Sequence, residues 1–251
     1  MNLQMEIPFY RGRIPMLSTA QMREVDRLMI DIFNIQLIQM LENAGRNLAR
    51  LAQSWFSSNI KREVKNVFIL AGSGGNGGGA LVCARHLVNI GVSVNVAITK
   101  SKSGFSQTAS NQLTILKNMG INIIGADEIE DCPGPDLTID GVIGYSLKGN
   151  PHGGAAKLIN WANSNISPII SLDVPSGLDS TIGQTFNPVI NANATMTLAL
   201  PKSGLFTKNL DHIVGELYLA NISVPPRLYE MLTPPIEVKN LFESGDIIRI
   251  K

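Results

Sequence analysis

A run of glycines at residues 72–79 is the feature of this sequence that points most directly to chemistry. Six of the eight residues are glycine, and the run lies between an apolar segment (67–70) and a segment with helical spacing (80–90). Glycine lets bulky anions approach backbone N–H groups, and the N-terminus of a helix attracts negative charge. The run therefore predicts a phosphate-binding turn, against the alternative of a flexible loop that needs only tight turns. Its spacing matches neither a P-loop nor a clean dinucleotide fingerprint, so it does not identify the molecule that carries the phosphate.

Two further loops follow apolar segments that end in an aspartate. Asp140 precedes a polar loop with several glycines that reaches Asn150, and Asp173 precedes the sequence Pro175-Ser176-Gly177. In open α/β sheets, ligands bind at the carboxyl ends of the strands. We therefore expect these two loops and the glycine run to meet in one crevice. One such aspartate alone is more typical of a helix cap or a turn, whereas two beside glycines favour a site.

Alternating strand and helix patterns must position these loops. Apolar, β-favouring segments predict strands at residues 67–70, 92–99, 121–124, 137–143, 168–174, 194–200 and 216–222. Helical spacing predicts helices at residues 80–90, 107–119 and 155–164, after a first helix that opens with a Ser18–Gln21 capping box and a second at 37–56. Such alternation is typical of a parallel sheet with helices on both faces.

The predicted fold class is therefore α/β. We expect a Rossmann-like three-layer αβα sandwich with a mostly parallel sheet and an N-terminal helical extension. The sequence contains no repeat, low-complexity tract or linker, so residues 1–251 are predicted to form a single domain with its core at about residues 18–226, after an irregular stretch at residues 1–16.

Composition narrows the class of partner. The chain has 251 residues, of which 44% are hydrophobic, and its 21 Lys and Arg nearly balance its 20 Asp and Glu. This balance argues against nucleic acid or a membrane surface held by bulk charge and favours a small-molecule substrate held by local geometry. Residues 1–16 lack the apolar region of a secretory signal, no segment is long enough to span a membrane, and Cys83 and Cys132 are too few for a disulfide framework. We therefore expect a cytoplasmic protein.

Several separate segments, in the same order, resemble the NAD(P)HX epimerase family, the YjeF N-terminal domain. The resemblance runs from Ser18 to about Pro226. The segments that carry it are Thr19-x-x-Met22-x-x-x-Asp26, Leu41-Glu42-Asn43-Ala44-Gly45-Arg46, Leu81-Val82-x-Ala84-Arg85-His86-Leu87, Asp173-x-Pro175-Ser176-Gly177-Leu178 and Thr195-x-Thr197-Leu198-x-x-Pro201-Lys202.

The resemblance implies an isomerase of nicotinamide nucleotide repair. Members of this family interconvert the R and S forms of hydrated NADH and NADPH, so that a dehydratase specific for one epimer can repair both. By resemblance, Asp173 is the catalytic acid and base. Lys148 is a second catalytic candidate because a lysine in this glycine loop can orient the substrate or stabilise negative charge, and a surface lysine without a role is the alternative. The implied nucleotide-binding set is Gly74, Gly75, Asn76, Gly77, Gly78, Gly79, Gly144, Tyr145, Ser146, Leu147, Lys148, Gly149, Asn150 and Asp173.

The family also binds a potassium ion, and its ligands correspond here to Asn76, Asp140 and Ser176. An amide, a carboxylate and a hydroxyl supply oxygen donors, which suit a hard cation. His86, His152 and His212 have no partner at the spacing of metal ligands, so we assign none of them to a site.

The glycine run departs from the family pattern Gly-x-Gly-Asn-Asn-Gly-Gly-Asp-Gly at three positions. Gly75 stands in place of the first asparagine, Gly79 in place of the aspartate and Ala80 in place of the last glycine. The departure keeps two alternatives open: an inactive nucleotide-binding or protein-interaction domain derived from the family, and an enzyme that acts on another adenine nucleotide. Asn76, Asp140, Asp173 and Ser176 are all present, which favours the active enzyme.

Two expectations concern protein partners. No dehydratase-like segment follows residue 226, so we expect the dehydratase to be a separate protein. The apolar positions Met22, Met29 and Met40 in the N-terminal helices predict a homodimer surface, unless these side chains pack against their own sheet.

Overall fold

The strands form one eight-stranded sheet in the computed structural model, which describes residues 6–251. Along the sheet they stand in the order β3-β2-β1-β4-β5-β6-β7-β8, and every neighbouring pair is parallel except β7 and β8. The strands are β1 Asn66–Ala71, β2 Ser93–Ile98, β3 Asn122–Gly125, β4 Leu137–Gly141, β5 Ile169–Leu172, β6 Ala194–Leu198, β7 Glu216–Ala220 and β8 Ile247–Arg249. The predicted α/β class with a mostly parallel sheet is confirmed, although no sequence pattern indicated β8.

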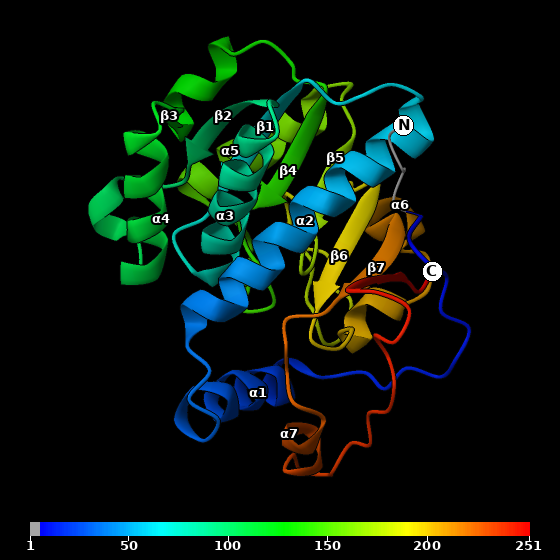
Figure 1. Cartoon of the computed structure of the whole chain (residues 1–251). Helices are drawn as coiled ribbons and strands as arrows, with labels where there is room; N and C mark the ends of the chain where they lie inside the picture. The colour runs from blue at the N-terminus through cyan, green and yellow to red at the C-terminus, as the bar shows by residue number, and fades with distance from the viewer. Residues whose placement is uncertain (1–5) are drawn as a thin grey trace.

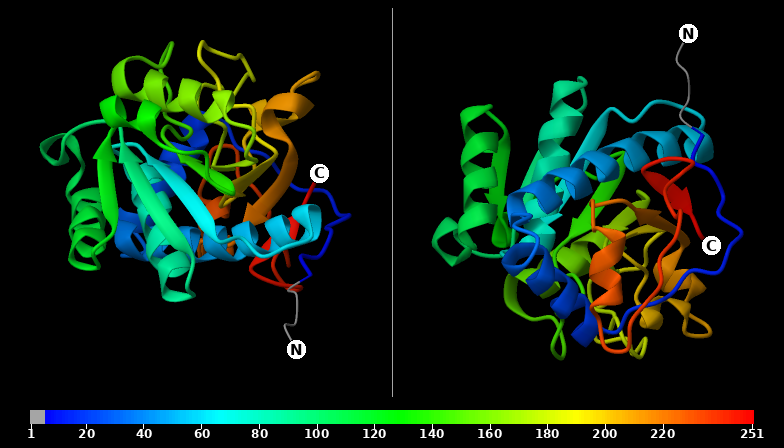
Figure 2. Two further views of the ribbon diagram at one scale, coloured as in Figure 1. Left: turned by 90° about the horizontal axis from the view of Figure 1, so that it is seen from above. Right: turned by 60° about the horizontal axis from the view of Figure 1, so that its bottom comes forward.

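Helices cover both faces of the sheet and give the three predicted layers. The helices α2, α3 and α4 lie on one face, and α5 lies on the other (Figure 1 and Figure 2). Their bounds, with those of the remaining helices, are α1 Thr19–Asp31, α2 Leu37–Ile60, α3 Gly75–Asn89, α4 Gln107–Asn118, α5 Gly153–Ser164, α6 Asp211–Val214 and α7 Pro226–Glu230. Short 3-10 helices occur at Lys102–Gly104, Ala126–Asp131 and Ser203–Phe206. Within the described part of the chain, no helix combines the length and the apolar character that crossing a membrane requires.

The central strands are buried on both faces, which explains their continuous apolar runs. In β1, residues 67–71 are all buried. The helix α2 packs along α3 and buries Leu48, Leu51 and Phe56 in the same apolar cluster as β1. It is therefore part of the helical layer on the sheet. The Ser18–Gln21 capping box at the start of α1 is present, as predicted.

The three N-terminal methionines are buried inside the chain. Met22, Met29 and Met40 are 3%, 0% and 4% exposed, and they pack in one apolar cluster with residues of α7 and β8. Of the two alternatives for these side chains, packing within their own chain is therefore the one that the structure has, and the homodimer stays a prediction. The cause is that the chain after β7 returns to cover α1, which the sequence patterns did not indicate.

The glycine run is more helical than predicted. The helix α3 starts at Gly75 with Gly74 as its N-cap, so only residues 72–74 form the turn. Gly77 allows close packing, because a Cβ atom there would lie 1.8 Å from the Gly72 carbonyl oxygen. At Gly78 a Cβ atom would lie 2.8 Å from Leu41 Cδ1 of α2. These two glycines therefore serve the packing of α3.

The two ends of the described chain lie side by side. Phe9 forms a parallel bridge to Arg249 of β8, and Leu17 forms one to Lys202. The predicted irregular stretch at 1–16 is thus partly held by the sheet edge, and its residues 1–5 fall outside the described residues. Cys83 is buried and Cys132 is partly exposed, and both are free, as expected.

Candidate active site

A cavity of about 710 Å³ opens at the carboxyl ends of the parallel strands. It lies where the chain changes direction in the sheet, because β2 and β3 follow β1 on one side whereas β4 lies on the other. This is the position at which open α/β folds bind ligands. The loops after β1, β4 and β5 all line the cavity, which confirms that they meet in one crevice. Side chains of α1 and α2, including Met22, Asp26 and Leu41, line the opposite wall.

Asp173 lies at the floor of this cavity, directly after β5. Its φ of 69° turns the chain sharply away from the strand. For this reason β5 ends at Leu172, the residue before Asp173, and not at residue 174 as predicted. The side chain is 5% exposed. Its Oδ2 accepts a hydrogen bond of 3.1 Å from the Tyr145 backbone N–H, and its Oδ1 accepts one from Lys202 Nζ. The carboxylate is therefore held in one orientation and faces the cavity with its charge paired.

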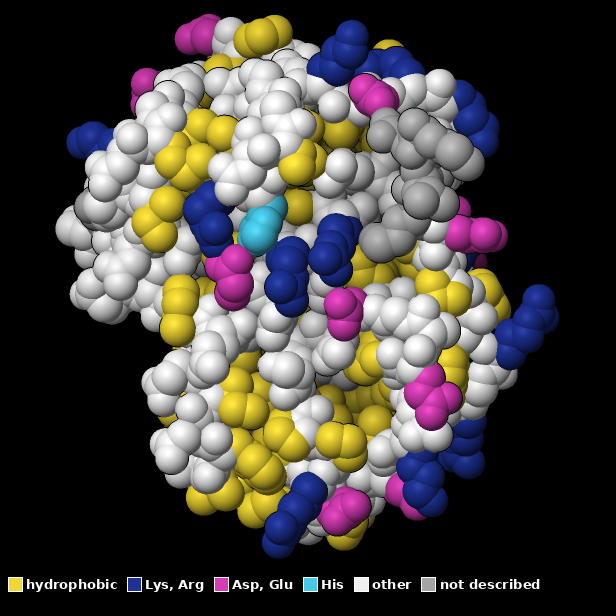
Figure 3. Space-filling view, viewed as in Figure 1, with side chains coloured by type: hydrophobic (Ala, Val, Ile, Leu, Met, Phe, Trp, Pro, Cys, Tyr) yellow, Lys and Arg dark blue, Asp and Glu magenta, His cyan; other side chains and the backbone are white. Residues whose placement is uncertain are grey.

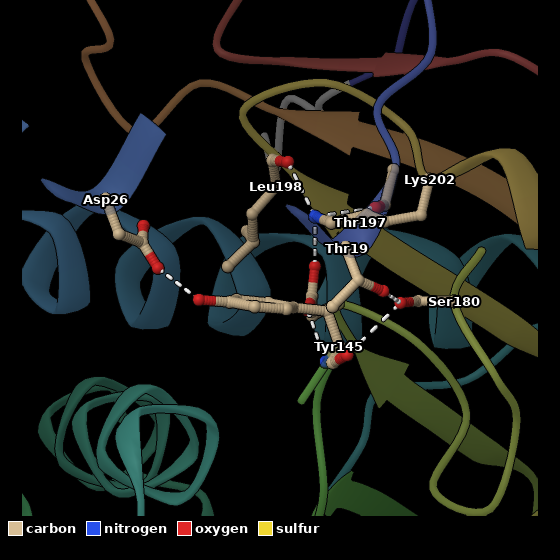
Figure 4. A network of polar contacts seen from close by, with 8 residues as sticks. Thr19, Asp26, Tyr145, Ser180, Thr197, Leu198 and Lys202 are labelled. Carbon is tan, nitrogen blue, oxygen red and sulfur yellow. Dashed lines mark hydrogen bonds and ion pairs between the residues drawn. The ribbon is translucent and has the colours of Figure 1, made fainter. Parts of the chain in front are cut away.

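Lys202 is the partner of Asp173, and its ammonium group is completely buried. It donates a further hydrogen bond of 2.9 Å to the Leu198 carbonyl oxygen (Figure 4). A buried ammonium group is costly unless it is paired and hydrogen-bonded, and here it is both. The sequence comparison included Lys202 within a motif but gave it no role. Only the fold shows that the loop after β6 brings it to Asp173.

A second carboxylate reaches the cavity from α1. Asp26 Oδ2 accepts a hydrogen bond of 2.5 Å from the Tyr145 hydroxyl (Figure 4). Burial raises the pKa of Asp26 above its usual value. Burial and the neighbouring Asp26 carboxylate raise the pKa of the Tyr145 hydroxyl, so it remains a proton donor. Tyr145 thus ties α1 to the loop after β4 and, through its backbone N–H, to Asp173.

The same loop is fixed to the N-terminus of α1 by hydroxyl groups. Ser180 Oγ donates a 3.1 Å hydrogen bond to the Tyr145 carbonyl oxygen and lies 2.7 Å from Thr19 Oγ1. These contacts explain why Thr19 and Asp26 occur in one sequence motif, because both lie on α1 and both hold the segment around Tyr145.

Asp140 and Ser176 lie beneath the wall of the cavity, and both are completely buried. Asp140 accepts hydrogen bonds from Ser176 Oγ at 2.6 Å, Ser171 Oγ at 2.8 Å and the Ser176 and Val142 backbone N–H groups. Burial raises the pKa of Asp140, and these hydrogen bonds oppose the effect. No Lys, Arg or His side chain within residues 6–251 forms an ion pair with it.

Asn76 faces the cavity close to the loop after β4. A Cβ atom at Gly144 would lie 3.2 Å from both Asn76 Oδ1 and Asp173 Oδ2, so glycine at this position lets the two polar groups approach each other. The buried Nδ2 atom of Asn76 has no hydrogen-bond partner among the described residues. An unpartnered buried polar atom beside a cavity is typical of a ligand site.

Most of the predicted nucleotide-binding residues line the cavity: Gly74, Gly75, Asn76, Gly79, Gly144, Tyr145, Ser146, Leu147, Lys148, Asn150 and Asp173. Gly77, Gly78 and Gly149 do not line it, and the first two pack against the protein itself. Lys148 is exposed at the mouth. The cavity also includes Asp26, Thr99, Lys100 and His152, to which the sequence analysis assigned no role.

The histidines lie in different surroundings. On α3, His86 Nε2 lies 2.8 Å from Glu42 Oε1 of α2. Glu42 also forms an ion pair with Arg85. Figure 3 shows charged and histidine side chains gathered over these two helices, and His86, Glu42 and Arg85 do not line the cavity. His152 lines the cavity at the start of α5, and His212 lies on α6.

Comparison with known proteins agrees with this architecture, which is that of an α/β domain with a cavity at the carboxyl ends of its strands. The sequence profile described as "YjeF-related protein N-terminus" matches residues 37–204. The chain therefore belongs to the YjeF-related N-terminal family. It is 41% identical over 214 residues to an NAD(P)H-hydrate epimerase of Dehalogenimonas lykanthroporepellens, covering 85% of this chain and 84% of that protein.

Other relatives extend this picture. An NAD(P)H-hydrate epimerase of Rhodopirellula baltica is 31% identical, with 86% of this chain and 87% of that protein covered. A bifunctional NAD(P)H-hydrate repair enzyme of Moorella thermoacetica is 31% identical over 85% of this chain, but the match covers only 41% of that longer protein. The crystal structure of the yeast protein ynu0 superposes with a TM-score of 0.79 at 25% identity, covering 94% of this chain and 100% of that one.

Proposed function

We propose that this protein is an NAD(P)H-hydrate epimerase, which interconverts the R and S forms of hydrated NADH and NADPH. The observation that carries the proposal is Asp173, a carboxylate paired with a buried lysine at the floor of a cavity lined by a glycine turn. Two relatives aligned over more than four fifths of both chains are named as such epimerases, which supports the same activity here.

Inversion of the hydrated carbon requires proton transfer whichever bond breaks. If the C–N bond breaks, the hydroxyl group loses its proton, the ring nitrogen gains one, and the ring closes again on the opposite face. If the C–O bond breaks, a proton from the hydrogen-bonded Lys202–Asp173 pair lets the hydroxyl group leave as water, and the water that then adds to the opposite face returns a proton to the pair. In the first route Asp173 accepts the hydroxyl proton and passes it to the ring nitrogen, while Lys202 compensates the charge of Asp173. The Tyr145 N–H fixes the carboxylate orientation throughout.

The remaining cavity residues bind and orient the substrate. The first residues of α3 line the cavity. Their backbone N–H groups have no side-chain partner at the N-cap, because the N-cap residue is Gly74. A diphosphate group placed there meets the positive end of the helix. Lys148 at the mouth of the cavity adds a positive charge that attracts and orients the phosphates.

We further propose that Asn76, Asp140 and Ser176 hold a potassium ion. These residues offer oxygen atoms that suit such an ion: the buried Asp140 carboxylate, which has no cationic partner among residues 6–251, the Ser176 hydroxyl and the Asn76 amide oxygen beside Gly144. When bound, the ion compensates the charge of Asp140 and fixes this loop. The loop carries Tyr145, so ion binding supports the orientation of Asp173.

Thermal unfolding tests the ion site without any activity measurement. At pH 8 we expect the melting temperature to be higher in potassium chloride than in choline chloride of the same concentration, because the ion binds only the folded state. Burial raises the pKa of Asp140, so its proton competes with the ion, and the difference should shrink as the pH falls. An Asp140→Asn variant provides the control. Equal melting temperatures in the two salts at pH 8 would contradict the site.

The activity is tested with one isolated epimer of hydrated NADPH. The approach to the R/S mixture is followed by chromatography, with a blank without protein because these epimers also interconvert unaided. We expect the protein to accelerate the approach. If folded protein binds the nucleotide but leaves the rate at that of the blank, the epimerase proposal is refuted.

If the epimerase proposal is refuted, the alternative is a nucleotide-binding domain without catalytic activity. The observation that raises this alternative is Gly79, which stands in place of the aspartate of the family pattern. A Cβ atom at this position would lie 2.9 Å from Leu172 Cδ2, so Leu172 fills the space next to the glycine. The absent carboxylate is therefore accommodated by packing, and Asp173 remains accessible to the cavity. This arrangement supports activity more than its loss.

A further inference from the structure

We propose that Lys100 binds the 2′-phosphate of hydrated NADPH, so that the protein acts on the phosphorylated substrate in preference to hydrated NADH. The inference rests on the proposed function and concerns the end of the cavity farthest from Asp173. It follows from three observations: the order of the strand ends, the absence of acidic groups from the cavity lining beside Lys100 and the helix that begins beside it.

The order of the strands fixes the direction in which a dinucleotide lies. The cavity residues follow the sheet edge from Thr99 and Lys100 after β2, through the glycine turn after β1 and the loop after β4, to Asp173 after β5. The ends of β2 and β5 are three strand spacings apart, or about 14 Å. With the nicotinamide ring at Asp173 and the diphosphate at the N-terminus of α3, the adenosine half extends towards Lys100.

A side chain close to the end of the second strand distinguishes the two nucleotides in dinucleotide-binding folds. An acidic side chain there binds the ribose 2′-hydroxyl of NAD, whereas a basic side chain accommodates the 2′-phosphate of NADP. Here β2 ends at Ile98, the first charged residue after it is Lys100, and residues 99–106 contain no Asp or Glu. The carboxylates that line the cavity are Asp26 and Asp173, both at the opposite end. The acidic segment Ala126–Asp131 packs against β2 and α5 but does not line the cavity, so a 2′-phosphate at Lys100 would meet no acidic group of the cavity lining.

The side chain of Lys100 is available for a ligand. It is exposed at the cavity mouth, and it forms no ion pair with any residue in the described range 6–251. Its alkyl chain runs past Gly104, where a Cβ atom would lie 3.2 Å from Lys100 Cδ. The glycine thus leaves room for the alkyl chain while the ammonium group stays free.

A second positive element lies next to Lys100. The N-terminus of α5 begins at Gly153, and the site of a Cβ atom on Gly154 is only 2.3 Å from the Thr99 carbonyl oxygen. The N-cap, His152, makes no side-chain capping hydrogen bond, and the first turn contains no acidic residue. The backbone N–H groups of α5 and the Lys100 ammonium group therefore act on the same anion.

Binding of two small adenosine nucleotides tests the inference independently of catalysis. Adenosine 2′,5′-bisphosphate and adenosine 5′-monophosphate differ only in the 2′-phosphate, and calorimetry measures both. For Lys100→Gln we expect about tenfold weaker binding of the bisphosphate and less than a twofold change for the monophosphate. Lys117→Gln is the matched control, because Lys117 is an exposed lysine in the last turn of α4 and does not line the cavity. It should leave both affinities unchanged.

Kinetics then connects binding to specificity. In the wild-type protein kcat/KM should be higher for hydrated NADPH than for hydrated NADH, and Lys100→Gln should lower only the value for hydrated NADPH. If Lys100→Gln weakens the binding of the bisphosphate and the monophosphate equally, or does not weaken the binding of the bisphosphate, the role of Lys100 is overturned. If the protein fails to epimerise either substrate yet shows the selective loss of bisphosphate binding, the proposed function fails and the phosphate site stands.

Discussion

The two ends of the cavity are built in opposite ways. At the β5 end, Asp173, Lys202, Tyr145 and Asp26 are joined by hydrogen bonds within the chain, and Lys202 is completely buried. At the β1–β2 end, a Cβ atom on Gly74 or Gly75 would meet no other atom within 4 Å, and Lys100 is free. One end is fully formed before a ligand arrives, whereas the other leaves its hydrogen-bond donors open.

This difference corresponds to two tasks. A proton-transferring group needs a fixed orientation, and the protein provides it with a paired charge and a backbone N–H at the floor of the cavity. Phosphate groups bring their own charge and acceptors, so the protein needs only unpaired N–H groups and a basic side chain. Between the two ends lies a closely packed region in which α3 contacts β4. Substitutions should therefore have effects that decrease from the closed end to the open end.

The largest effect on stability is expected at the closed end. Lys202→Met leaves Asp173 buried without its counter-charge, which should lower the free energy of unfolding by about 3–5 kcal/mol. Denaturant unfolding measures this change. The double variant Asp173→Asn with Lys202→Met should be more stable than Lys202→Met alone, because it removes both charges. A decrease in the free energy of unfolding of less than about 1 kcal/mol in Lys202→Met would show that the Asp173–Lys202 pair is not buried as described.

An intermediate effect is expected where α3 meets β4. A Cβ atom at Gly141 would lie 2.3 Å from Ala80 Cβ, so Gly141→Ala should cost about 1–3 kcal/mol through overpacking. Ala80→Gly restores the family residue and opens the contact. Gly141→Ala should therefore cost much less in the Ala80→Gly background than in the wild-type protein. Equal costs in the two backgrounds, measured by chemical unfolding, would refute this contact.

The smallest effect is expected at the open end. Gly75 is the first residue of α3 and has free space around it, so Gly75→Ala should leave stability unchanged or raise it by up to about 1 kcal/mol. The same variant is expected to weaken nucleotide binding if phosphate oxygens approach this backbone. A loss of stability as large as that of Gly141→Ala would contradict the contrast between the two regions.

Regular patterns allowed the sheet and the convergence of the loops to be predicted from the sequence. The apolar run of β1 and the aspartates at strand ends follow directly from burial and from the position of ligands in parallel sheets. The sequence did not reveal the antiparallel β8, because three residues are too few for a recognisable period. The sequence left the burial of Met22, Met29 and Met40 as one of two alternatives, because α7 and the C-terminal segment cover them only through contacts between distant parts of the chain.

The site was predictable where a residue type implied its chemistry and unpredictable where a partner lay far away in sequence. Asp140 and Asp173 could both be placed at the site because each ends an apolar segment beside glycines, and the family resemblance selected Asp173 as the acid and base. Its partner Lys202 follows it by 29 residues, and no spacing rule connects the two. The start of α3 at Gly75 also escaped prediction, because glycines are rare within helices, and here close packing against Gly72 and Leu41 overrides that tendency.

The most direct test of the account is the rate of epimerisation by Asp173→Asn. One isolated epimer of hydrated NADPH is given to wild-type protein, to the variant and to a blank, in potassium buffer, after nucleotide binding and thermal unfolding have shown that the variant is folded. General acid–base catalysis by Asp173 predicts a rate about 10²–10⁴-fold lower than that of the wild type. A folded variant that retains the wild-type rate would contradict the assignment of Asp173 as the proton-transferring group.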